Sequence, residues 1–177
     1  MNEDLYYFLL ENNYLTHGIG EANDQETYFK FDSILKNSGL MSLEKLRQIG
    51  INVTGKVPSD SFRNILVNQI SLFDPSIPEI KARLLSKSCS YFLPFSSNVI
   101  FFIIDREGLN LERHPEIPFE IKSNEEIIST KNFKGIIAPT ECSKLLDNIQ
   151  KKYGLCLPIY DFDFNLKNNL EDNKKHI

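Results

Sequence analysis

His17 and the glycine after it are the first residues whose types suit chemistry on a bound ligand. They follow the apolar segment Tyr14–Thr16, for which the pattern predicts a strand broken by the glycines at 18 and 20. A histidine at a strand end can hydrogen-bond a polar ligand, and a glycine lets that ligand approach the main-chain N–H and C=O groups closely. The pair indicates either a ligand site or a hydrogen-bonded histidine in the core.

A second polar position lies in the β-prone segment Ile65–Phe73, which the prolines at 75 and 78 end. Side chains in a strand alternate between its two faces, so Ser71 and Gln69 are expected on one face. This segment is therefore a candidate to contribute Ser71 to the same ligand site as His17.

A pair of glutamates opens a later apolar segment, Glu126–Ser129. Alternation places Glu126 on the face of Ile128 and Glu125 on the opposite face. A fixed carboxylate at a strand end can orient a ribose hydroxyl and stabilise the positive charge that develops at a sugar anomeric carbon. Glu126 is the preferred candidate for this role, and Glu125 is the alternative.

These positions must be held by a mixture of helices and strands. Helices are predicted at Asp4–Asn12, at Phe29–Ser38, between the N-cap Ser42 and Gly50, at Ile80–Leu85, and at Glu141–Tyr153 with Thr140 as its cap. Further strands are predicted at Val99–Ile104 in the sheet centre, at Phe119–Lys122, at Gly135–Ala138, and at Leu155–Tyr160 on an edge. Helices come mostly early and strands mostly late, which favours an α+β fold over alternating α/β.

Length and composition fit one globular domain, placed at residues 1–164, with a polar and disordered tail at residues 165–177. No apolar run is long enough to cross a bilayer, so no membrane association is expected. The start of the chain lacks a basic n-region, so we expect a cytoplasmic protein, or one secreted without a cleavable signal peptide. The three cysteines form no CxxC pair, and no metal is expected. The net charge of −4 argues against a broad nucleic-acid footprint.

The Thr-His-Gly strand end, followed by Phe-Asp-Ser-Ile-Leu-Lys-Asn-Ser-Gly-Leu-Met-Ser at residues 31–42, resembles the opening of ADP-ribosyltransferase-like domains. This superfamily includes bacterial toxins and effectors, the poly-ADP-ribose polymerase branch and tRNA 2′-phosphotransferases. Residues 68–72, 126–129 and 133–139 resemble its later strands, so the similarity spans roughly residues 14–161. The resemblance implies a split β-sheet core with N-terminal helices.

The resemblance also implies a role for each candidate residue, with NAD as the substrate. His17 would bond the adenosine-side ribose, and the main chain of Gly18 would hold the nicotinamide carboxamide. Ser71 would support the site from its strand, and Glu126 would be the catalytic carboxylate.

An aromatic ring stacks on nicotinamide in many family members, and Tyr28 or Tyr91 would do so here. The chain reads Asn124-Glu125-Glu126 where a Glu-x-Glu or Gln-x-Glu pair would target arginine. The acceptor therefore stays open between a protein and a nucleic acid, and no oligomeric state is indicated.

The leading hypothesis is a mono-ADP-ribosyltransferase, in the manner of a bacterial effector or toxin. One alternative is a tRNA 2′-phosphotransferase-like enzyme. Such an enzyme needs a basic pocket for the 2′-phosphate, and the arginines of this chain are not clustered in the sequence. The other alternative is a catalytically inactive domain of the same fold that binds a partner.

Overall fold

The computed structural model describes residues 1–20, 23–51, 68–85, 99–114, 117 and 120–168, with no side chain described at position 83. Tyr91 and the expected start of a strand at Phe119 lie outside these residues. Within the described part of the chain, no helix is long and apolar enough to span a membrane.

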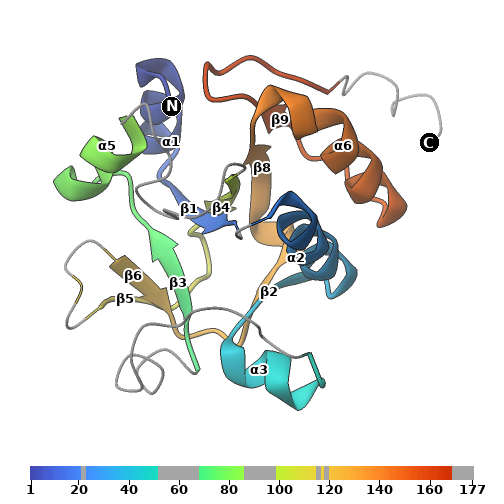
Figure 1. Cartoon of the computed structure of the whole chain (residues 1–177). Coiled ribbons are helices and arrows are strands. Elements are labelled where there is room, and N and C mark those ends of the chain that lie inside the picture. The colour runs from blue at the N-terminus through green and yellow to red at the C-terminus, as the bar shows by residue number, and fades with distance from the viewer. Residues whose placement is uncertain (21–22, 52–67, 86–98, 115–116, 118–119, 169–177) are drawn as a thin grey trace.

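Most strands form one seven-stranded sheet with the order β5-β6-β3-β1-β4-β8-β9 (Figure 1). Its strands are β1 Tyr14–Ile19, β3 Ile70–Phe73, β4 Ile100–Asp105, β5 Leu111–Arg113, β6 Glu120–Ser123, β8 Phe133–Ile137 and β9 Ile159–Tyr160. All pairings are antiparallel except that of β8 with β9. A second, two-stranded sheet pairs β2 (Gly39–Met41) with β7 (Ile127–Ser129). The α+β class is confirmed.

Four of the described helices pack on the large sheet, two on each face, and α3 (Leu43–Gln48) lies beside β2 (Figure 1). They are α1 Glu3–Glu11, α2 Asp24–Lys36, α3 Leu43–Gln48, α5 Pro78–Leu85 and α6 Ser143–Lys152, with 3₁₀ turns at Thr130–Asn132 and Thr140–Cys142. Apolar residues of α2 and α6 pack in one core cluster with one face of β1, β3 and β4. Those of α1 and α5 pack on the other face. We call these the α2 side and the α1 side of the sheet.

β4 supplies the centre of both cores, as its continuous apolar run predicts. Phe102 and Ile104 belong to the α2-side core, and Phe101 and Ile103 to the α1-side core. All four are fully buried. Phe31 of α2 stacks on Phe102 with ring centroids 5.4 Å apart, which fixes α2 over the middle of the sheet.

β1 and β3 pair with each other through one residue pair only. Along β1, all six residues from Tyr14 to Ile19 pair with β4, whereas only Thr16 pairs with β3, at Phe73. Beyond Thr16 the ladder between β1 and β3 stops, whereas the ladder between β1 and β4 continues. The large sheet is therefore weakly joined between β1 and β3.

Two predicted boundaries near the candidate site are wrong. β1 continues through Gly18 instead of ending at it, because β4 pairs with it to the end and because Gly18 suits the packing. A side chain at Gly18 would place its Cβ 2.9 Å from the ring of Phe101. α2 begins at Asp24, five residues before the predicted start, because the side chain of Asn23 caps it by accepting from the N–H of Glu26.

Of the predicted caps Ser42 and Thr140, the first is confirmed and the second is wrong. Ser42 caps α3, and its Oγ accepts from the N–H of Lys45 at 3.2 Å. Thr140 opens a 3₁₀ turn instead of capping a helix, and α6 begins only at Ser143.

The described chain packs against the sheet as far as Asn168, four residues into the stretch expected to be a tail. Asn168 accepts a hydrogen bond from the N–H of Ile159 and donates one to the carbonyl of Leu157. The N–H of Lys167 donates to the oxygen of Ile159. These bonds cover the outer side of β9, which lies at the sheet edge as predicted.

Candidate functional site

The imidazole of His17 is held by a main-chain oxygen on the neighbouring strand. Its Nδ1 lies 2.7 Å from the carbonyl oxygen of Ser71. A carbonyl oxygen only accepts, so Nδ1 carries the proton and donates it. Burial lowers the pKa of His17 and outweighs this hydrogen bond, which acts in the opposite direction, and the charge of Lys30 lowers it further. The ring is therefore neutral, and Nε2 is left as a hydrogen-bond acceptor.

The ring lies on the α2 side of the sheet, where β1 and β3 separate. Leu15 and Ile19, which alternate with His17 along β1, belong to the α2-side core. His17 is also directly opposite Phe102 in the β1–β4 pairing, under the turn of α2 that carries Phe31. His17 thus lies on the α2 side of β1, next to the point where the pairing of β1 with β3 ends.

Ser71 contributes to this contact through its main chain and not through its hydroxyl. Its neighbours Ile70 and Leu72 are in the α2-side core, so the side chain of Ser71 faces the α1 side. There its Oγ donates a short hydrogen bond to Oε1 of Glu120. The structure brings His17 and Ser71 together as predicted, but the serine hydroxyl is on the opposite face from the imidazole.

Glu120 is a polar partner that the sequence reasoning missed. It is the first residue of β6, pairs with Phe73 of β3, and is 6% exposed. Glu120 lies inside the predicted strand Phe119–Lys122. Its contact with Ser71 is not visible in the sequence, because it depends on the long-range pairing of β6 with β3.

Glu126 lies just before β7 of the two-stranded sheet and is open to solvent. Ile128, which alternates with it, is buried in the α2-side core. The N–H of Ser42 donates to the main-chain oxygen of Glu126 at 2.9 Å, which ties the start of β7 to the start of α3. Its Oε2 lies 3.4 Å from Nζ of Lys45, and its side chain is 67% exposed. The structure places no contact between Glu126 and His17 or Ser71.

Glu125 is positioned differently from Glu126. Its main-chain N–H donates to Oγ of Ser123 at 3.3 Å. Of the two glutamates, Glu126 is the more exposed.

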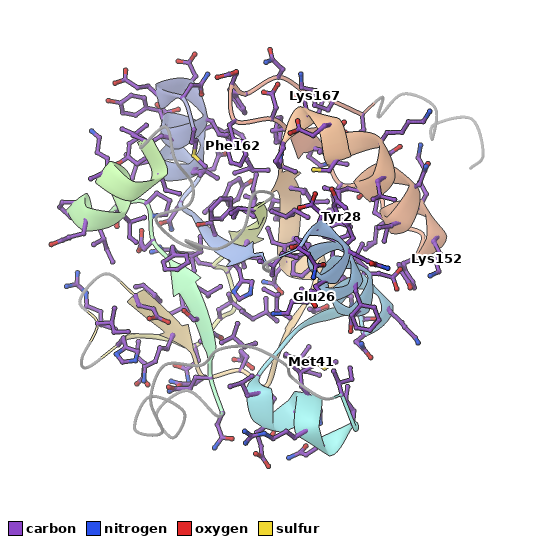
Figure 2. All side chains as sticks on the ribbon, viewed as in Figure 1. Glu26, Tyr28, Met41, Lys152, Phe162 and Lys167 are labelled. Carbon is purple, nitrogen blue, oxygen red and sulfur yellow. The ribbon has the colours of Figure 1, made fainter. Side chains whose placement is uncertain are left out.

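Two further predicted residues serve packing. Gly18 has no side chain, and the ring of Phe101 occupies the space on the α1 side where one would lie. Tyr28 extends from α2 (Figure 2) into the α2-side core, where it hydrogen-bonds Cys142. Burial, reinforced by Cys142, raises the pKa of Tyr28 to about 12. Stacking of Tyr28 on a ligand stays a prediction.

A surface depression of about 450 Å³ is lined by other residues, from α2, from the end of β2 and from the segment after α3. Its lining combines exposed apolar side chains with the polar edge of α2, and comprises Phe29, Asp32, Ser33, Lys36, Asn37, Met41, Ile49 and Ile51. None of the predicted site residues lines it.

In the ranges that the structure describes, no three side chains of the metal-binding types gather to hold an ion. Neither protein-family models nor curated proteins give a significant match to this chain. The functional argument therefore rests on the contact between His17 and Ser71, and on the exposed carboxylate of Glu126 beside Lys45.

Proposed function

We propose that this chain is an ADP-ribosyltransferase-like domain that transfers ADP-ribose from NAD to a macromolecular acceptor. The observation that carries the proposal is the hydrogen bond between Nδ1 of His17 and the main-chain oxygen of Ser71, which makes Nε2 the acceptor nitrogen of the neutral ring. An acceptor nitrogen is suited to the hydroxyl groups of a ribose. The single residue pair that joins β1 to β3 supports the split-sheet core that the sequence resemblance implies.

In the proposed reaction, the bond between nicotinamide and C1′ of the ribose breaks, and nicotinamide leaves with the bonding electrons. The ribose becomes an oxocarbenium-like species. Glu126 accepts a hydrogen bond from the 2′-hydroxyl and stabilises this positive charge. A nucleophile of the acceptor then forms the new bond to C1′ and loses its proton to solvent. His17 accepts a hydrogen bond from the adenosine-side ribose through Nε2 and orients the dinucleotide.

Glu126 fits the carboxylate role better than Glu120 for two reasons. Glu120 faces the α1 side of the large sheet with the Ser71 hydroxyl, whereas His17 lies on the α2 side. The side chain of Glu126 is two-thirds exposed, whereas Glu120 is almost fully buried. A carboxylate must reach the substrate to act on it.

The test is nicotinamide release from NAD by the wild-type chain and by the matched variants Glu126→Gln and Glu125→Gln. We expect Glu126→Gln to slow release about 100-fold or more, because it removes the charge that stabilises the oxocarbenium ion. Glu125→Gln should retain activity within about threefold of the wild type. Equal turnover by wild type and Glu126→Gln would overturn the catalytic assignment. NAD binding without any turnover by the wild type would instead identify an inactive domain of this fold.

A further inference from the structure

The main chain of Lys45 is connected to the main chain of Glu126 through Ser42. Ser42 accepts a hydrogen bond from the N–H of Lys45 through its Oγ, and donates its own N–H to the main-chain oxygen of Glu126. Ser42 is 1% exposed, so this connection lies inside the protein. The start of α3 and the start of β7 are therefore joined through one buried residue.

The side chains of Lys45 and Glu126 meet on the surface side of this connection. Nζ lies 3.4 Å from Oε2, and the two side chains are 29% and 67% exposed. An ion pair this exposed contributes little net free energy, because water screens both charges. Either partner can therefore be exchanged for a ligand group at small cost.

We propose that Lys45 binds the diphosphate of NAD, and that it leaves Glu126 when it does so. This inference rests on the proposed function. The diphosphate is attached through C5′ to the ribose whose 2′-hydroxyl Glu126 would bind. The diphosphate is therefore separated from Glu126 by about the width of one ribose, which a cation beside Glu126 can reach. A doubly charged diphosphate attracts an ammonium group more strongly than a single solvated carboxylate does.

The exchange also has a consequence for Glu126. While Lys45 holds the carboxylate, one of its oxygens is occupied. When the diphosphate takes the ammonium group, both oxygens become available to the ribose hydroxyl. Binding of the charged part of the substrate would thus release the carboxylate for the reacting part.

The test measures the affinity of a ligand series by titration calorimetry: adenosine, AMP, ADP and ADP-ribose. For Lys45→Gln we expect ADP and ADP-ribose to bind about 10- to 100-fold more weakly, because a charge-assisted hydrogen bond is lost, while adenosine is changed less than twofold. Lys45→Arg should retain most of the affinity, because it keeps the charge. Arg47→Gln is the matched control, since Arg47 is an exposed cation on the same helix. In steady-state assays Lys45→Gln should raise KM for NAD more than it lowers kcat.

Three outcomes would overturn the inference. If Lys45→Gln binds ADP-ribose as tightly as the wild type does, Lys45 does not contact the diphosphate. If it loses adenosine and ADP-ribose equally, the role of Lys45 is to hold α3 in place, and an altered thermal midpoint should accompany this. If the wild type binds neither NAD nor ADP-ribose, the proposed function fails together with the inference. In the first two outcomes the wild type still binds the ligands, so only the role of Lys45 fails.

Discussion

Nδ1 of His17 donates a hydrogen bond to the main-chain oxygen of Ser71, a residue 54 positions further along the chain. This contact lies just beyond the single residue pair that joins β1 to β3. It selects one tautomer of the imidazole, and it does so without using the side chain of Ser71. The identity of the residue at 71 should therefore matter less to the orientation of the ring than the position of the strand does.

The contrast between His17→Ala and Ser71→Ala tests this relationship. His17→Ala should weaken NAD binding about tenfold or more, because it removes the ribose acceptor. Ser71→Ala should keep NAD affinity within about threefold, because the carbonyl remains. It should nevertheless lower the free energy of unfolding by about 1–3 kcal/mol, since buried Glu120 loses its hydroxyl partner. Titration with NAD and urea denaturation measure the two effects, and equal loss of affinity in both variants would contradict the prediction.

The lowered pKa of His17 predicts a pH dependence of stability. In the unfolded chain His17 titrates near 6.5, and in the folded protein it titrates below that value. Between the two pKa values the unfolded state binds more protons, so the free energy of unfolding rises with pH. The contribution of neutral His17 is complete above about pH 6.5 and is lost as the pH falls through the folded-state pKa.

His17→Gln is the variant that isolates this contribution, because its amide can still donate to the oxygen of Ser71. Wild type should lose more stability than His17→Gln when urea denaturation is repeated from about pH 7 down to about pH 5. Parallel stability curves for the two proteins would show that His17 does not titrate as proposed.

Glu120→Gln separates stability from reactivity. The amide keeps the shape of the buried carboxyl group but weakens its hydrogen bond with Ser71, so we expect a loss of about 1–2 kcal/mol. Nicotinamide release per folded molecule should stay within about threefold of the wild type. A loss of release comparable to that of Glu126→Gln, with the fold intact, would move the catalytic role to Glu120.

Gly39→Ala tests whether the small sheet positions Glu126. A Cβ at Gly39 would collide with the main-chain oxygen of Ile128 in β7, two residues after Glu126. We expect β7 to shift, with nicotinamide release reduced about tenfold or more, because catalysis depends on the position of the carboxylate. Gly108→Ala is the control, since Gly108 has a positive φ of 76° but nothing within 4 Å of an added Cβ. Its effect should be confined to stability.

Local patterns predicted much of this structure. The side chain of Ser42 caps α3 as expected, and the apolar run of β4 is buried on both faces. Pro158 precedes an edge strand, where its missing N–H costs nothing. Each of these features depends on neighbouring residues, so it is visible in sequence.

The relationships that the sequence did not reveal are long-range. Glu120 meets Ser71 only because β6 pairs with β3, and no local signal sets that pairing. Continuation of β1 through Gly18 depends on Phe101 in β4. The early start of α2 is a missed local signal, because Asn23 with Glu26 three residues later is an N-cap pattern.

The bonds of Asn168 and Lys167 to β9 have a consequence for how copies of this protein behave toward one another. A sheet edge with free N–H and C=O groups can pair with the edge of a second molecule and so begin aggregation. Here the side-chain amide of Asn168 and the main chain of Lys167 occupy those groups at Leu157 and Ile159. The last described residues therefore act as a cover that keeps this edge from joining another molecule.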